Sequence, residues 1–290
     1  MSSPDQIQRV LFEDADIRSV LTGLKDSYQQ ALAKHQYPDQ LRDILGQMMA
    51  AVSLLSATLK FDGRLMLQAQ SENQVRVLVA ECNHQRDLRA IARFEGELPD
   101  YSCFREMMAG GQLVITIEPE NGKRYQGVVP LEGDHLNQCL EAYFSRSEQL
   151  PTQIHLAADA ERAAGFLLQV MPAKGDSGDD WQHFSYLGAT LKDDELLQLD
   201  NETILHRLFH DEKCRLYEAD ALQFKCDCSR KRTEDALKYM TQDELEEIVR
   251  EEGVIEVSCQ FCNELYQFDQ TDITMMFSDS ANIEGSDQVH

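Results

Sequence analysis

The sequence predicts an α+β protein with a large N-terminal domain, a helical linker and a small C-terminal module. Three observations support this class. Residues 1–172 contain short runs in which apolar residues alternate, as in strands, and also amphipathic helical stripes. These two kinds of pattern do not follow a βαβ order. An acidic segment with scattered apolar positions follows at 173–220. Near the C-terminal end, four cysteines stand in two close pairs.

The N-terminal domain, residues 1–172, is expected to contain a mostly antiparallel, meandering sheet with a few packed helices. Apolar residues recur at three- and four-residue steps between Leu41 and Leu55, which predicts a buried helix. Asn121-Gly122 predicts a hairpin turn, and Asp134 is the expected cap of a second helix. The expected strands are 8–12, 65–69, 75–79, 88–94, 112–118, 124–129, 153–157 and 165–171.

The linker, residues 173–220, begins with a charged, glycine-containing joint at 174–180. It carries 12 acidic and 5 basic residues, a net charge of −7. Its apolar positions predict short amphipathic helices that are stable only when they dock against a neighbour. An ordinary helical connector is equally compatible with this sequence.

The two cysteine pairs are Cys226–Asp227–Cys228 and, after a 30-residue insert, Cys259–Gln260–Phe261–Cys262. Two close cysteine pairs that are separated by a short folded insert have the spacing of a four-cysteine Zn²⁺ site. The metal binds thiolates, so all four cysteines would lose their protons. The alternative is four free thiols that happen to be close in sequence.

Basic residues flank the first pair in an otherwise acidic chain. Their positive charge is expected to stabilise the thiolates. These flanking residues are Lys225, Arg230, Lys231 and Arg232.

The zinc-binding module is expected to span residues 221–275. A capping box at Thr241 predicts a helix that ends at Gly253, and a hairpin follows with the second cysteine pair at its tip. A core this small is marginal without a metal to hold it, so removing zinc should unfold the module. Residues 276–290 are expected to form a disordered tail.

Composition narrows the function classes. The formal net charge of −24 argues against a nucleic-acid or anionic-membrane partner. The chain has no apolar run of membrane-spanning length and no secretory signal pattern, so a cytoplasmic location with reduced thiols is expected.

Cys139 is expected to be a buried thiol, and no role is assigned to Cys82, Cys103 or Cys214. The linker histidines His183, His206 and His210 are expected to be surface or packing residues rather than ligands.

The chain resembles a known family, the redox-regulated heat-shock chaperones called 33 kDa chaperonins. The rare CxC pair, followed about 30 residues later by CxxC, is that family's cysteine pattern, and similar segments extend over nearly the whole chain. The matching segments are 59–63, 124–129, 131–134, 143–152, 167–172 and 224–230.

The resemblance implies an ATP-independent holdase of the bacterial cytosol, not an enzyme, that is inactive while reduced and zinc-bound. In the family, oxidation forms two disulfides and releases zinc. Here these would be Cys226–Cys228 and Cys259–Cys262. The module and linker then unfold, apolar surface binds unfolding client proteins, and the active form tends to form a homodimer.

Two other functions remain as alternatives. A thiol–disulfide oxidoreductase could use Cys259 and Cys262, but such enzymes place CxxC at a helix N-terminus after a βαβ pattern. A zinc module could bind nucleic acid, but residues 241–290 carry 13 acidic side chains against the single basic Arg250.

Overall fold

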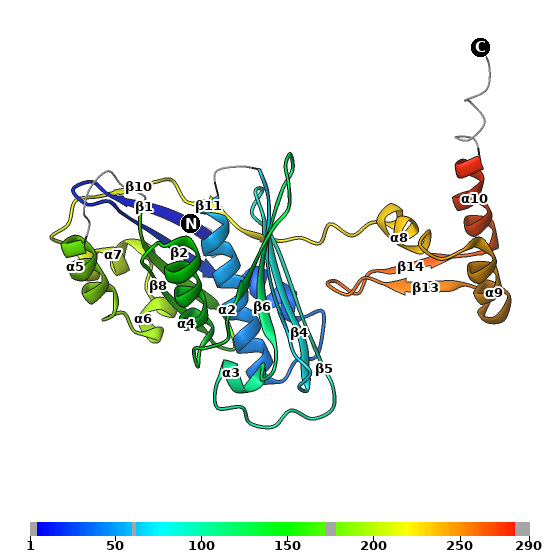
Figure 1. Cartoon of the computed structure of the whole chain (residues 1–290), viewed down its shortest axis with the longest axis horizontal. Helices are drawn as coiled ribbons and strands as arrows, with labels where there is room; N and C mark the ends of the chain where they lie inside the picture. The colour runs from blue at the N-terminus through cyan, green and yellow to red at the C-terminus, as the bar shows by residue number, and fades with distance from the viewer. Residues whose placement is uncertain (1–4, 60–61, 172–177, 282–290) are drawn as a thin grey trace, which may run out of the picture. The chain divides into compact units, whose positions relative to one another are not determined.

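The computed structural model describes residues 5–59, 62–171 and 178–281. It divides into two compact units, Met1–Lys225 and Cys226–His290. The chain combines antiparallel sheets with helices, so the α+β class is confirmed (Figure 1). The expected joint at 174–180 and the domain boundary after residue 172 fall largely outside the described residues.

The strands of unit 1 form two sheets, whereas the sequence pattern predicted one meandering sheet. The first sheet runs β10-β1-β2-β9-β8, with β11 also paired to β1, and all of its pairings are antiparallel. Its strands are β1 (Gln6–Phe12), β2 (Ile17–Leu24), β8 (Thr152–Ala158), β9 (Ala163–Val170), β10 (Cys214–Leu216) and β11 (Asp220–Ala221).

The second sheet runs β12-β5-β4-β3-β6-β7. It is antiparallel except where β12 pairs with β5. Its strands are β3 (Gly63–Gln70), β4 (Val75–Asn83), β5 (Asp87–Phe94), β6 (Gln112–Pro119), β7 (Tyr125–Val129) and β12 (Gln223–Phe224).

Helix α2 (Asp39–Ser56) joins the two sheets through one hydrophobic core and lies against both (Figure 1). From Leu41 to Leu55 its apolar stripe is buried, as the sequence predicted. The smaller helical elements of this part are α1 (Asp26–Leu32), α3 (Phe104–Met107), α4 (Leu136–Tyr143) and the π-helix η1 (Phe144–Glu148).

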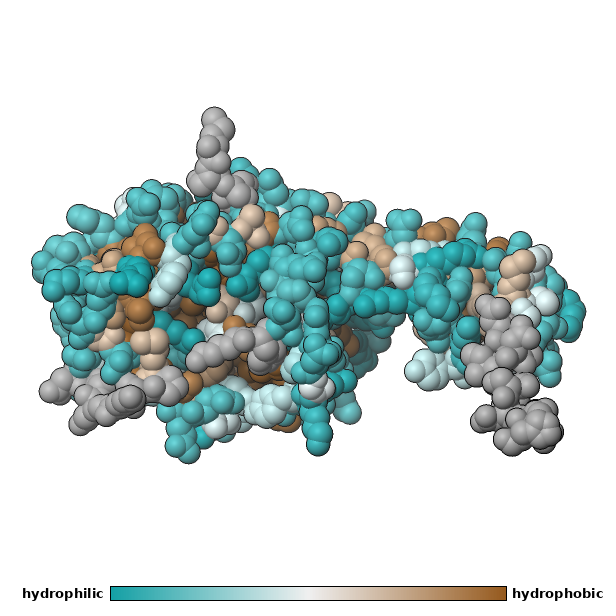
Figure 2. All heavy atoms as spheres, turned by 90° about the horizontal axis from the view of Figure 1, so that it is seen from above, coloured by the Kyte–Doolittle hydropathy of each residue, from teal (hydrophilic) through white to brown (hydrophobic). Residues whose placement is uncertain are grey.

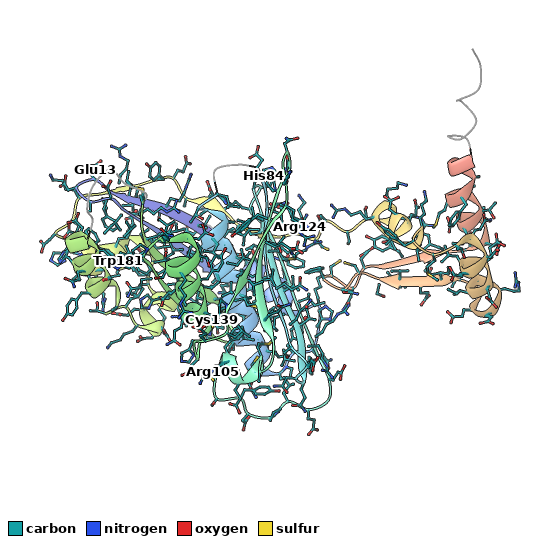
Figure 3. The ribbon with its side chains drawn as sticks, viewed as in Figure 1. Glu13, His84, Arg105, Arg124, Cys139 and Trp181 are labelled. Atoms are coloured by element: carbon teal, nitrogen blue, oxygen red, sulfur yellow. The ribbon has the colours of Figure 1, made fainter. Side chains whose placement is uncertain are left out.

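The linker forms short helices, as the sequence predicted, and they pack against the first sheet. They are α5 (Gly178–Gly188), α6 (Asp193–Gln198) and α7 (Asn201–Phe209). Phe184 and Phe209 contact Phe12 of β1, with ring centroids 4.5 and 5.0 Å apart. Trp181 of α5, labelled in Figure 3, packs against the same cluster. The linker then continues into β10 and β11, which extend the sheet itself.

Two local expectations differ from the structure. Strand β2 was not expected from the sequence, because α2 covers one face of it and the linker helices cover the other, so its residues do not alternate between apolar and polar. Helix α4 begins at Leu136 with His135 as its N-cap residue. Asp134, the expected cap, instead forms an ion pair with Arg105 at 2.7 Å.

The described part of unit 2, residues 226–281, contains three helices and a hairpin: α8 (Arg230–Leu237), α9 (Gln242–Glu252), β13 (Ile255–Ser258), β14 (Leu265–Phe268) and α10 (Gln270–Ala281). The capping box at Thr241, the end of α9 at Gly253 and the hairpin all match the sequence predictions. The core holds six buried residues: Leu245, Val249, Ile255, Phe268, Ile273 and Met276. Met276 and Phe277 belong to α10, so the folded module extends past the expected boundary at 275. Residues 282–290 of the expected tail lie outside the described residues.

Hydrophilic residues predominate on the face drawn in Figure 2, with hydrophobic residues visible in patches between them. Among the described residues, no helix combines the length and apolar character needed to cross a membrane.

Candidate metal and redox centre

Two irregular segments of unit 2 carry the four cysteines. Cys226 and Cys228 lie between β12 and the start of α8, whose N-cap is Ser229. Cys259 and Cys262 lie in the turn of the β13–β14 hairpin. The Cys259 amide donates to the carbonyl of Glu264 and its carbonyl accepts from the Asn263 amide, both at 2.8 Å. Asn263 takes a positive φ of 59°, which lets the turn close around the pair.

The structure brings all four predicted sulfurs together, within 4.8 Å of one another. Cys226 Sγ is 3.6 Å from Cys259 Sγ, and Cys228 Sγ is 3.3 Å from Cys262 Sγ. Four sulfurs each about 2.3 Å from a tetrahedral Zn²⁺ would lie about 3.8 Å from one another. The cluster therefore fits the ligand set and the size of a four-cysteine zinc site.

Burial opposes ionisation of three of the thiols, those of Cys226, Cys259 and Cys262, and local hydrogen bonds act differently on each of the three. Burial and the neighbouring thiols raise the pKa of Cys226 and, more strongly, of Cys262. Cys259 is also partly buried, but the amides of Cys262 and Phe261, together with the adjacent thiols, hold its pKa below the usual value. Bound Zn²⁺ would favour the thiolate at all four positions.

Tyr266 is a neighbour of the cluster that no sequence pattern indicated. Its hydroxyl donates to Cys228 Sγ at 3.2 Å, and this bond raises the pKa of the tyrosine. Tyr266 lies on β14 opposite Val257. The Tyr266 hydroxyl lies beside the Cys228 sulfur only because the fold brings the first cysteine pair to the hairpin. No spacing in the sequence indicates this contact.

The basic residues near the first pair have carboxylate partners. Lys225 pairs with Asp87 at 3.0 Å, and Arg230 pairs with Asp272 at 2.7 Å while its guanidinium lies over the Phe268 ring. The remaining two cations pair nearby, Lys231 with Asp235 and Arg232 with Asp227. These acids offset part of the positive charge near the sulfurs, so thiolate stabilisation by the four cations stays a prediction.

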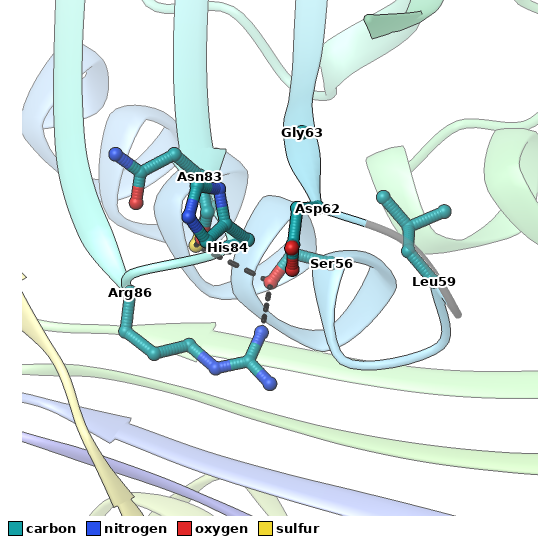
Figure 4. Close-up of a pocket in the computed structure, with 8 residues that line it drawn as sticks. Ser56, Leu59, Asp62, Gly63, Asn83, His84 and Arg86 are labelled. Carbon is teal, nitrogen blue, oxygen red and sulfur yellow. Dashed lines mark hydrogen bonds between the residues drawn. The ribbon is translucent and has the colours of Figure 1, made fainter. Parts of the chain in front are cut away.

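The other four cysteines belong to unit 1, whereas the cluster belongs to unit 2. Cys139, on α4 and labelled in Figure 3, is buried as expected. Cys103 and Cys214 are partly exposed. Cys82 is buried at a cavity of about 300 Å³, where Ser56 Oγ donates to its sulfur at 3.2 Å and accepts from Arg86 (Figure 4). Burial raises the pKa of Cys82 to about 11.

Cys82 should therefore resist alkylation in the folded protein. About one thiol in a thousand is ionised three pH units below its pKa, and iodoacetamide reacts with the thiolate. At pH 8 we expect Cys82 to be modified only after denaturation, while the partly exposed Cys103 is modified in the native protein. Mass mapping of the labelled peptides checks this, and equal labelling of both native thiols would contradict the burial of Cys82.

The linker histidines have local partners. His183 Nε2 lies 2.8 Å from Glu212, and the rings of His206 and His210 are 5.9 Å apart. Within the described part of the chain, the one group of three or more potential ligands close enough to share a metal ion is the cysteine cluster.

Comparison with known proteins adds independent findings. The model of the family described as Hsp33 protein matches residues 5–269. A 33 kDa chaperonin from Shewanella sediminis is 44% identical over 278 residues, which cover 96% of this chain and 97% of that protein. A protein of the same name from Pseudomonas paraeruginosa is 47% identical over 285 residues, 96% of each chain.

A solved structure shares the fold. The crystal structure of a 33 kDa chaperonin from Thermotoga maritima, a heat shock protein 33 homologue, matches with a TM-score of 0.83. The match covers 97% of this chain and 100% of the other, at 21% identity. These findings confirm the resemblance drawn from the sequence: the chain belongs to the Hsp33 protein family.

Proposed function

We propose that this protein is a redox-regulated, ATP-independent holdase of the cytoplasm that binds unfolding proteins and prevents their aggregation. In the reduced state Cys226, Cys228, Cys259 and Cys262 hold Zn²⁺ and the protein is inactive. Oxidation of each thiolate pair to a disulfide transfers two electrons to an oxidant such as peroxide, which takes up two protons from the solvent and is reduced to two water molecules. With its ligands oxidised, the zinc leaves and the protein becomes active, as a homodimer.

The observation that carries this proposal is the four-sulfur cluster between two separate segments of unit 2. A zinc ion there would join the segment before α8 to the β13–β14 hairpin, in a unit whose core has six buried residues. Such a small core depends on its metal. Oxidation at the cysteines would therefore remove the interaction on which the fold of unit 2 depends.

The linker helices supply a surface that activation could uncover. Phe184, Leu205 and Phe209 are buried against the first sheet of unit 1. The sheet residues beneath them include Phe12 and Phe166, which are also fully covered. If the linker helices undock when unit 2 unfolds, these apolar residues become accessible to apolar segments of a client protein.

The geometry of the second cysteine pair favours the chaperone over an oxidoreductase. Catalytic CxxC pairs sit at a helix N-terminus, where the helix dipole lowers the pKa of one thiol. Cys259 and Cys262 instead lie in a hairpin turn and are grouped with two further thiols. A nucleic-acid-binding module is disfavoured because all four basic residues near the cluster have carboxylate partners.

Light scattering of a heat-aggregating client tests the proposal. The reduced, zinc-loaded protein should leave aggregation unchanged, and the oxidised protein should suppress it near an equimolar ratio without ATP. The Cys103→Ser variant, altered at a cysteine outside the cluster, should behave like the wild type. Equal protection by the reduced and oxidised proteins would contradict redox control, and no protection by either would contradict the holdase function.

The order of oxidation is a further prediction. A disulfide needs Cα atoms about 4.4–6.8 Å apart. Cys259 and Cys262, three residues apart in a turn, can meet this with little distortion. Cys226 and Cys228 are two residues apart, and in an extended segment their Cα atoms lie near or beyond that limit. We expect Cys259–Cys262 to form first, and Cys226–Cys228 to require heat together with peroxide.

Mass mapping over time, with zinc content and client protection measured on the same samples, checks this order. The shortest sulfur distances join the two segments, so the mapping must also test Cys226–Cys259 and Cys228–Cys262. Activity should follow the second bond. Formation of Cys226–Cys228 first, a bond between the segments, or full activity with all zinc bound would contradict the prediction.

A further inference from the structure

A cavity of about 530 Å³ lies in unit 1 and is lined by none of the four clustered cysteines. It is formed by both sheets, the end of α2 and the π-helix η1, and its size is typical of small-molecule sites. Its walls are largely apolar. The apolar lining residues are Leu55, Leu59, Leu65, Ile115, Ile117, Pro119, Phe144 and Leu150.

Arg18 of β2 brings a positive charge to this cavity. Its guanidinium donates to Gln169 Oε1 through Nε at 3.1 Å and through Nη2 at 2.5 Å. Within the described part of the chain, no carboxylate pairs with Arg18. Burial lowers the pKa of Arg18, as expected for a cation that is partly removed from water without a counterion.

The partners of Arg18 hold it in place without neutralising it. Arg18 faces Gln169 in the β2–β9 register, and Gln169 faces Thr152 in the β8–β9 register. Gln169 is 1% exposed and donates to Thr152 Oγ1 at 2.8 Å, which directs its carbonyl oxygen to the guanidinium. A glutamate at 169 would have formed a buried ion pair. The neutral amide instead leaves the full charge available at the cavity.

When Arg18 is included, the charges that line the cavity sum to a net positive value. Lys123 lines it and, among the described residues, has no ion pair. Glu148 also lines it, but its carboxylate accepts from the Tyr143 hydroxyl at 3.0 Å. The C-terminal end of α2 contributes a partial negative charge, smaller than one full charge. A smaller adjacent hollow shares Arg18 and adds a second guanidinium, that of Arg9.

We propose that this cavity binds an amphipathic carboxylate, with the anionic head on the Arg18 guanidinium and an alkyl chain along the apolar wall. An anion there would supply the counterion that Arg18 lacks, through a charge-assisted hydrogen bond. The alkyl chain of the ligand would cover apolar side chains between the two sheets. The site is separate from the redox centre, so binding is expected in the reduced protein.

Calorimetric titration of the full-length, reduced, zinc-loaded protein with decanoate, below its micelle concentration, tests the proposal. We expect one site per chain, with affinity that rises about fourfold per methylene from hexanoate to decanoate. Decanol, which lacks the charge, should bind at least tenfold more weakly. No saturable decanoate binding, or equal binding of decanol, would overturn the proposal.

Variants test the assigned residues. Arg18→Gln should weaken decanoate binding at least tenfold, and Ile117→Trp should block the space for the chain. Arg124→Gln is the matched control, because Arg124 pairs with Glu118 at the surface and does not line the cavity (Figure 3). Circular dichroism and melting temperature establish that each variant is folded. Folded Arg18→Gln protein with wild-type affinity would overturn the proposal, as would an equal loss in Arg124→Gln.

Discussion

Chelating zinc from the reduced protein should unfold unit 2 and leave the two sheets of unit 1 folded. Structural zinc contributes about 10–16 kcal/mol of apparent folding free energy in small modules, which is comparable to the whole stability of a typical domain. The core of unit 2 has six buried residues and cannot replace that contribution. The hairpin β13–β14 and helices α9 and α10 should therefore lose structure together.

Hydrogen exchange with peptide mapping measures this effect. Amides of β13 and α9 should exchange at the rate of an unfolded chain after chelation, and Cys262→Ser should have the same effect without a chelator. Cys214→Ser is the matched control, since Cys214 lies on β10 of unit 1 and should leave zinc content unchanged. Persistent protection of β13 in metal-free protein would show that the apolar core alone stabilises unit 2.

Phe209→Ala should undock the linker helices and allow activation by milder oxidation. Phe209 is 2% exposed and its ring lies 5.0 Å from Phe12 and 5.5 Å from Phe184, between centroids. Truncating a buried phenylalanine costs about 3–5 kcal/mol. Docking stabilises these short helices, so most of that loss should appear as increased exchange in α5 and α7.

Client protection by Phe209→Ala, measured against oxidant concentration, should begin at a lower concentration than in the wild type. Tyr186→Ala is the control, because Tyr186 lies on α5 with 77% of its surface exposed. If both variants follow the wild-type curve while Phe209→Ala exchanges faster in α7, undocking of the linker does not limit activation.

The sequence was most informative where a local pattern determines structure. The stripe from Leu41 to Leu55 depends on helical periodicity, and the helix after Thr241 depends on a capping box, so both could be identified without tertiary contacts. The cysteine spacing likewise predicted the four-sulfur cluster, because each short pair keeps its own two thiols close.

Features that depend on contacts between distant segments could not be predicted. The separation into two sheets depends on α2 packing against both of them. Strand β10 contains three residues and is specified by the exposed edge of β1, not by its own pattern. The hydrogen bond from Tyr266 to Cys228 and the contact between Arg18 and Gln169 likewise join residues far apart in sequence.

In the proposed function, the redox state of the four cysteines controls the docking of the linker. Hydrogen exchange of α7, compared between the reduced, zinc-loaded protein and the protein oxidised by peroxide with heat, tests it most directly. We predict that α7 is protected before oxidation and exchanges freely afterwards, while the strands β3 and β4 of the second sheet stay protected. Equal protection of α7 in both states, with zinc fully released, would contradict the claim.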